Sequence, residues 1–296
     1  MARPALSAAR ALEIVDLMAG VPDRPFTLSE LVRATNSNFA SCHAVLTTLV
    51  ARAWLVRDEA RKSYRLGPAL FAAGQAMAQH DEILGIMTSA AEGLAERTGL
   101  VLAISARTQD EMVGISRHGA AEIMGRGLQA GERVPLRPPI GATLMAWSDD
   151  REIDLWIGRG GLAADCSEAV SLRAQLAAIR RRGYLATLDS DGYAALSAAV
   201  SLRNRGESVQ IREDQFISGL FGDLSQPDRI EGGASYDLAY IGAPVFDRAG
   251  RPIYSLVLSG FKGRIDGRTL EGFATELTRL CTDVMRSGAH STRFAV

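Results

Sequence analysis

The order of segments in the first 67 residues is the feature that most constrains the fold of this 296-residue chain. Apolar residues recur at helical spacing from Leu6 to Met18, and Val21–Pro25 then breaks the pattern. A second helix is predicted to begin at Thr27, because Thr27 and Glu30 have the spacing of a capping box. A third helix is predicted from about Ser37 to Arg52, where a polar cluster suits a turn and a new helix cap.

The two faces of the third helix differ in character. At about 100° per residue, an inner face centred on Leu46 is expected to be core. The other members of this inner face are Phe39, Cys42, Leu49, Val50 and Ala53. The opposite face has only one charge, and it consists of Ser37, Ala40, Ser41, Ala44, Thr47, Thr48, Ala51 and Arg52. Such a smooth face indicates a close fit against a partner, and His43 on its border is expected to be partly buried and hydrogen-bonded.

The segments after the third helix predict a β-hairpin, with short strands at 54–57 and 63–67 around a polar turn. Three helices and a hairpin form a winged helix-turn-helix, whose third helix enters the DNA major groove while a basic hairpin holds the backbone. The expected DNA-binding residues are Ser37, Asn38, Ala40, Ser41, Ala44, Thr47, Thr48, Arg57, Arg61, Lys62 and Arg65. A winged helix used only for protein contact is the alternative.

The charge distribution permits a polyanionic partner for this part of the chain. Residues 1–80 carry nine basic and six acidic side chains, a net of +3, whereas the remainder has a net of −4. Because the contrast is small, it permits DNA as a partner without requiring it.

Segments spread along the whole chain each match a part of one family's sequence pattern. These segments are 8–15, 28–31, 46–58, 64–67, 131–136, 140–146, 179–184, 243–250 and 256–260. They occur in the order found in the IclR family of bacterial transcriptional regulators, which this sequence closely resembles. The resemblance implies an α+β protein, with an N-terminal winged helix-turn-helix and a C-terminal GAF-like α/β effector-binding domain.

The expected domains are the winged helix-turn-helix at 1–75, a linker helix region at 76–98 and the effector-binding domain at 99–290. An insertion is expected at about 189–235. After residue 67, helices are predicted at 68–79, 81–97, 142–148, 151–158, 167–182 and 269–286. Strands are predicted at 101–105, 112–117, 185–188, 238–246 and 253–258, in a mixed sheet wrapped by helices.

The sequence departs from the family pattern at several positions. Ala44 stands where the family usually has a basic residue, Tyr240 where it often has cysteine, and Val257 where it often has serine. The usual glycine-lysine pair is Gly141-Ala142 here. An alanine at position 44 can still contact a thymine methyl group, while Ser41 and its neighbouring threonines can hydrogen-bond to bases or phosphates.

The resemblance implies an effector pocket under a glycine-led helix. The expected effector-binding residues are Met124, Leu128, Pro139, Ile140, Gly141, Ala142, Tyr240, Val257 and Ser259. The helix start and Ser259 could anchor a carboxylate, while Tyr240 and Val257 add apolar surface. We therefore expect an aromatic or alicyclic acid, amide or hydrazide. The alternative is that Tyr240 and Val257 fill the space and leave little or no pocket.

Features typical of other functions are weak. The cysteines at 42, 166 and 281 are odd in number and far apart, so neither a disulfide framework nor a zinc site is expected. The acidic residues Asp189, Asp191, Glu213 and Asp214, the glycine-rich 158–161 and His118 match no catalytic or metal-binding spacing. We expect no catalysis and no cofactor. A small-molecule enzyme with an accessory winged helix is the alternative function.

The expected partners are a double-stranded DNA operator, a small-molecule effector and further copies of the chain. A twofold dimer reads two half-sites, so a homodimer or homotetramer on a palindrome is expected. The chain has no apolar run long enough to cross a membrane and no export signal at its start, which predicts a cytoplasmic location.

Overall fold

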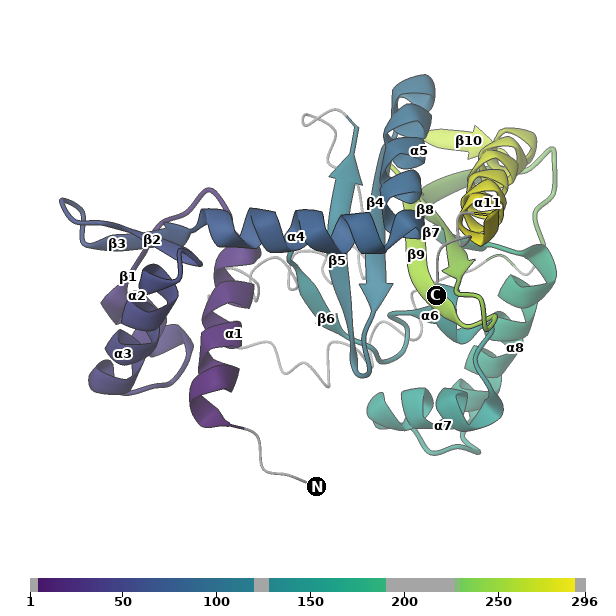
Figure 1. The fold of residues 1–296 in the computed structure, drawn as a ribbon. Coiled ribbons are helices and arrows are strands. Elements are labelled where there is room, and N and C mark those ends of the chain that lie inside the picture. Colours follow the sequence, from purple (N-terminus) through teal and green to yellow (C-terminus); the bar gives the residue numbers. More distant parts are fainter. Residues whose placement is uncertain (1–4, 120–127, 190–226, 228, 291–296) are drawn as a thin grey trace. The chain divides into compact units, whose positions relative to one another are not determined.

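The computed structural model describes residues 5–119, 128–189, 227 and 229–290. These residues form two compact units, the first ending at Asp81 and the second beginning at Glu82. Figure 1 shows the elements of each unit, and the two units are described separately. Met124, Asp191, Glu213, Asp214 and most of the expected insertion lie outside the described residues.

The first unit contains three helices, a small sheet and a further long helix (Figure 1). Its elements are α1 (Leu6–Ala19), β1 (Phe26–Thr27), α2 (Leu28–Ala34), α3 (Phe39–Ala51), β2 (Leu55–Asp58), β3 (Ser63–Leu66) and α4 (Pro68–His80). The sheet is antiparallel in the order β1-β3-β2. This is the element order of a winged helix-turn-helix, and β1 is the element that the sequence did not predict.

Side chains cap the helices of this unit where the sequence predicts it. The Thr27 side chain accepts a hydrogen bond from the Glu30 amide, and the Glu30 carboxylate accepts one from the Thr27 amide, which completes the capping box. Asn38 caps α3 by accepting a hydrogen bond from the Ser41 amide at 2.8 Å. These caps fix the residue at which each helix begins.

The core of the first unit corrects the predicted inner face of α3. Phe39 is 56% exposed and Ala53 is also exposed, whereas Val45 is buried beside Cys42 and Leu46. At about 100° per residue, the buried direction of α3 therefore lies about 50° from Leu46 toward Val45. This rotation moves Phe39 away from the core, and Ala53 lies beyond the end of the helix with a φ of 57°.

The second unit is a seven-stranded sheet with helices on both faces. Its helices are α5 (Glu82–Thr98), α6 (Ala142–Met145), α7 (Asp150–Arg159), α8 (Ser167–Arg182) and α11 (Gly267–His290). Its strands are β4 (Val101–Arg107), β5 (Glu111–His118), β6 (Arg133–Pro135), β7 (Leu185–Leu188), β8 (Ser235–Phe246), β9 (Pro252–Ser259) and β10 (Arg264–Asp266). Helices and strands lie close to their predicted positions, apart from the unexpected β6 and β10.

The sheet has the order β10-β8-β9-β4-β5-β6, and β7 pairs with β8. Every strand pair among the described residues is antiparallel, so the expected mixed sheet is wrong in this respect. A short turn between two strands forces them to pair antiparallel, as at the tight turn between β8 and β9 around Gly250.

The two faces of this sheet pack against different helices. Leu256 and Leu258 of β9 are fully buried in a cluster with residues of α5 and α11. A second cluster contains residues of α6, α7 and α8 together with Leu185 of β7 and Tyr240 of β8. Because neighbouring residues of a strand point to opposite faces, the side chains of Val257 and Ser259 lie on the α6 side.

Candidate functional site

The predicted DNA-binding residues of α3 lie on its exposed side and around its first turn. Ala40, Ala44, Thr47 and Thr48 are exposed, and the two threonine hydroxyls donate to the carbonyls of His43 and Ala44 at 2.8 and 3.0 Å. Each of these hydroxyls keeps an acceptor site for another donor. This part of α3 therefore offers methyl groups and hydroxyl oxygens without charge.

Three predicted contacts of α3 are engaged within the unit. Asn38 is the helix cap described above, and the hydroxyls of Ser37 and Thr35 lie 2.9 Å apart. The Ser41 hydroxyl accepts a hydrogen bond from the Arg10 guanidinium of α1. Asn38 and Ser41 thus have structural partners before any DNA is bound.

Arg10 is a candidate DNA-binding residue that the sequence analysis missed. It is separated from Ser41 by 31 residues, so no local motif connects them. The contact places a partly buried positive charge beside the first turn of α3. Burial raises the pKa of the nearby Cys42 thiol, and the opposing influences of Ser37 and Arg10 are weaker, so the thiol stays protonated and serves as core.

His43 differs from its expectation. The side chain is exposed, because the buried direction of α3 is rotated toward Val45. His43 therefore lies on the same flank of the helix as Phe39, four residues before it.

The basic residues of the hairpin do not share one face. In the register, Arg57 pairs with Tyr64 and Val56 pairs with Arg65, so the side chains of Arg57 and Arg65 point to opposite faces. The Arg57 guanidinium lies 6.0 Å from the centre of the Tyr64 ring and 3.4 Å from the Glu59 carboxylate. Arg61 and Lys62 are exposed in the turn, and the Asp58 carboxylate accepts a hydrogen bond from the Arg61 amide.

Several of the predicted effector-binding residues lie on the α6 side of the sheet, and Met124 is outside the described residues. Leu128, Ile140 and Tyr240 are partly buried against the same cluster, which also contains Ala142. Across the sheet, Ser259 pairs with Tyr240, and Val257 pairs with Gly242. The structure thus brings together two segments about 100 residues apart in the sequence.

Buried hydroxyl groups gather between this face of the sheet and α6. Their side chains are almost fully buried, and they belong to Ser105, Thr143, Thr187, Ser255 and Ser259. The Ser105 hydroxyl donates to the Ser255 carbonyl at 3.4 Å. Burial raises the pKa of the Tyr240 phenol, and a weaker hydrogen bond with Thr187 opposes this shift, so the phenol is neutral at neutral pH. The face presents neutral hydrogen-bonding groups.

The start of α6 offers fewer free amides than the sequence suggests. The helix has only four residues, and the amides of Ala142, Leu144 and Met145 already donate to backbone carbonyls. Gly141 precedes it with a φ of 86°, which favours glycine, and a Cβ atom there would lie 2.2 Å from Leu136 Cδ1. This glycine serves the close packing of α6.

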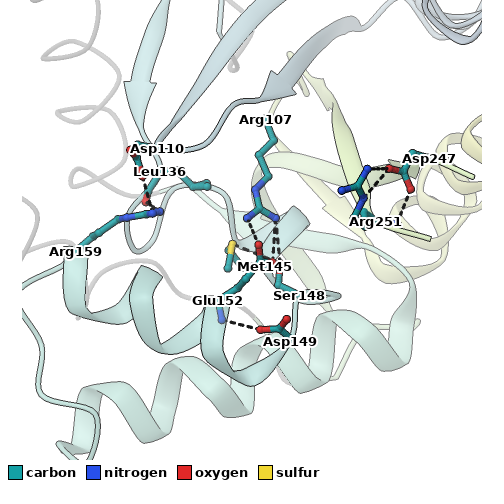
Figure 2. A network of polar contacts seen from close by, with 10 residues as sticks. All are labelled: Arg107, Asp110, Leu136, Met145, Ser148, Asp149, Glu152, Arg159, Asp247 and Arg251. Carbon is teal, nitrogen blue, oxygen red and sulfur yellow. Dashed lines mark hydrogen bonds and ion pairs between the residues drawn. The ribbon is translucent and has the colours of Figure 1, made fainter. Parts of the chain in front are cut away.

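A network of polar contacts ties α7 to the sheet (Figure 2). Arg107, at the end of β4, donates to the Glu152 carboxylate at 2.8 Å and to the Ser148 hydroxyl at 3.2 Å. Burial tends to raise the pKa of Glu152, but hydrogen bonds from Arg107 and Ser148 outweigh it and hold this pKa below its usual value. Arg159 makes a second link through Asp110 at 2.6 Å. Both links fix the chain segment that contains α6 and α7 to the end of the sheet near β4 and β5.

The described residues contain no cluster of three side chains suited to a metal ion. None of the helices in the described part of the chain is both long and apolar enough to cross a membrane.

Part of the chain matches a known protein family. Residues 75–212 match the family model described as bacterial transcriptional regulator IclR C-terminal. This match covers 138 of the 296 residues and identifies this part of the chain as a C-terminal domain of the IclR type. No curated protein sequence matches the chain.

Solved structures share the fold at low sequence identity. The IclR transcriptional regulator from Alicyclobacillus acidocaldarius is 18% identical with a TM-score of 0.70, and the match covers 97% of this chain and 100% of that chain. The Thermotoga maritima IclR is 17% identical with a TM-score of 0.57, covering 96% and 99%. An IclR homolog from Microbacterium hydrocarbonoxydans, complexed with 4-hydroxybenzoate, is 15% identical with a TM-score of 0.65, covering 96% and 100%.

Proposed function

We propose that this protein binds a palindromic DNA operator as a homodimer or a dimer of dimers. Binding of a small organic effector then lowers or raises its affinity for the operator. Two observations carry the DNA-binding part, namely the exposed, uncharged surface of α3 and the exposed cations of the hairpin that follows it in the chain. The hairpin cations would contact phosphates, while α3 would contact base edges. Such a protein acts where the DNA is, in the cytoplasm.

The proposed base contacts come from Ala40, Ala44, Thr47 and Thr48, and Ser37, Asn38 and Ser41 would add contacts around the first turn. Phosphate contacts come from Arg61, Lys62 and Arg65. Arg57 is a weaker candidate because its side chain is engaged with Tyr64 and Glu59.

A homodimer is supported by the surface of α4. This helix of 13 residues contains no Asp, Glu, Lys or Arg, and Phe71 and Met77 on it are 72% and 50% exposed. Exposed apolar surface of this kind marks a site of protein association. A twofold interface uses the same patch on both copies. The resulting dimer has two winged helix-turn-helix units, one for each half-site of a palindrome.

The dimer is tested by replacing Phe71 and Met77 with glutamate and measuring the mass in solution by light scattering. We expect the double variant to lose the dimer, because burying two carboxylates in an apolar interface is costly. Val170→Glu is the matched control, since Val170 is 60% exposed on α8 and is expected to leave the mass unchanged. A dimer that survives the double substitution would contradict this interface.

The proposed effector is an aromatic or alicyclic acid, amide or hydrazide. The buried neutral hydroxyls between the sheet and α6 suit a ligand with a few polar groups, while Leu128, Ile140 and Tyr240 suit an apolar body. The Microbacterium homolog complexed with 4-hydroxybenzoate supports an aromatic acid. Pro139, Gly141, Ala142, Val257 and Ser259 complete the proposed site, to which Met124 belongs by sequence alone.

The effector proposal is tested by thermal shift and calorimetry with 4-hydroxybenzoate and its amide. A ligand at a hundredfold excess over Kd should stabilise the protein by about 2.7 kcal/mol. Ser259→Ala should weaken this binding. Saturable binding of glyoxylate or pyruvate, with no binding of any bulkier acid or amide, would contradict the proposal.

A further inference from the structure

Phe39 is a large apolar side chain left exposed at the start of the helix that is proposed to enter the DNA. It is the first residue of α3 and is 56% exposed. The cap from Asn38 to the Ser41 amide fixes where the helix begins, and therefore where Phe39 projects. An aromatic ring in water at this position has an unfavourable hydration free energy that a partner could remove.

Phe39 lies on one flank of α3, between the buried direction and the proposed reading surface. The buried direction of α3 is set by Cys42, Val45 and Leu46. At about 100° per residue, Phe39 lies about 70° from that direction, on the flank that also carries His43. The other flank carries Ser41, which is held by Arg10.

The small residues of the proposed reading surface would let the helix approach base edges closely. Ala40 and Ala44 are both exposed and have side chains of a single methyl group. These alanines point about 100° and 140° away from Phe39 around the helix. Because a phenyl ring is much longer than a methyl group, the Phe39 ring extends further from the helix than they do. No residue of the first turn of α3 carries a charge, and the Arg10 guanidinium contacts this turn on the other flank, at Ser41.

The major groove offers one apolar group, the C5-methyl group of thymine. Hydrogen-bonding side chains recognise the other bases through their donors and acceptors, which a phenyl ring lacks. Burying a methyl group against an aromatic ring is favourable for the same reason as any apolar burial.

We propose that Phe39 is a specificity-determining residue that selects thymine in each half-site of the operator by contacting its methyl group. This inference rests on the proposed DNA-binding function, and it gives Phe39 a role that its predicted place in the core excluded.

The test uses the full-length protein and a pool of duplex DNA with a randomised central region. Selection with the wild-type protein gives the preferred sequence, and thymines in that sequence are then replaced one position at a time by deoxyuridine, which lacks only the methyl group. Affinity is measured by fluorescence anisotropy for the wild type, Phe39→Ala and Leu155→Ala. Leu155 is 55% exposed on α7 and is the matched control for truncating an exposed apolar side chain.

We expect deoxyuridine at one position of each half-site to weaken wild-type binding about fourfold, the equivalent of about 0.8 kcal/mol for one buried carbon group. Phe39→Ala should bind the thymine and deoxyuridine duplexes equally, and its own selection should lose the preference for thymine. Leu155→Ala should behave as the wild type.

Three results would overturn the inference while leaving DNA binding intact. They are a wild type insensitive to every deoxyuridine substitution, a Phe39→Ala variant weakened equally on all sequences, and a Phe39→Ala variant whose mass in solution shows a lost protein contact. Failure of the proposed function looks different, because the wild type would then select no sequence from the pool. Circular dichroism of Phe39→Ala should match the wild type, since an exposed side chain contributes little to stability.

Discussion

The two polar surfaces of this protein carry similar side chains under opposite conditions. On α3 the hydroxyls of Thr47 and Thr48 are exposed, whereas on the sheet of the second unit those of Thr187 and Ser259 are buried. An exposed hydroxyl exchanges its partners with water at little cost, but a buried one must keep a hydrogen bond or lose about 1–3 kcal/mol. Substitutions on the α3 surface should therefore leave the free energy of unfolding nearly unchanged. Substitutions among the buried hydroxyls should affect both this free energy and ligand binding.

The largest effect is expected from a pair of isosteric substitutions that contrast the two surfaces. Thr187→Val should lower the free energy of unfolding by about 1–3 kcal/mol, because it removes the hydrogen bond to the buried Tyr240 phenol. Thr48→Val should change it by less than about 0.5 kcal/mol, since position 48 is exposed. Chemical denaturation of both variants measures the difference, and equal losses would remove the contrast.

The next effect concerns affinity on the exposed side. Arg61→Ala combined with Lys62→Ala should weaken binding to all DNA sequences by a similar factor. The salt dependence, log K against log salt, should become shallower by about two units per bound protomer, because two phosphate contacts are lost. An anisotropy titration at several salt concentrations measures it. An unchanged slope would show that the hairpin turn does not contact phosphates.

A smaller effect is expected from the reading residues. Thr48→Val and Ser41→Ala should change the preference among operator sequences by about 1 kcal/mol, roughly fivefold, while affinity for unrelated DNA stays the same. Competition between selected and unselected duplexes measures this. A purely uniform loss of affinity would mean that these hydroxyls do not contact bases.

The smallest effect tests the link between β4 and α7. The pKa of Glu152 is lowered in the folded protein, so its contribution to stability is present above its unfolded pKa and is lost as the pH falls through the folded value. In Arg107→Gln this contribution should shrink, by about 0.5–1 kcal/mol at most because Glu152 is partly exposed. Chemical denaturation should therefore show that the wild type has a higher free energy of unfolding than Arg107→Gln at pH 7, and that this difference is smaller at pH 3. An advantage independent of pH would contradict this account.

Local sequence was sufficient to predict the elements that depend on local interactions. The capping box at Thr27 and the α8 helix are examples, since caps and periodicity lie within a few residues of each other. The short strands β1, β6 and β10 were not predicted, because two or three residues carry no periodicity and their pairing depends on distant partners.

The candidate sites show the same limit. The orientation of α3 depends on its neighbours in the fold, so a helical wheel centred on Leu46 placed Phe39 in the core. The contact between Arg10 and Ser41 joins two helices, and the cluster of buried hydroxyls arises from the register of several strands. Neither has a signature in a short stretch of sequence.

The central claim is that the protein binds duplex DNA as a dimer, and that each copy uses the exposed cations of its hairpin and the uncharged surface of its α3. The most direct measurement is an anisotropy titration of the full-length protein with duplex DNA from upstream of its own gene, at salt concentrations from 50 to 300 mM. With Arg61, Lys62 and Arg65 contacting phosphates from each of two copies, log K should fall with log salt with a slope of about −5. No binding at the lowest salt concentration, or a slope near zero, would contradict the claim.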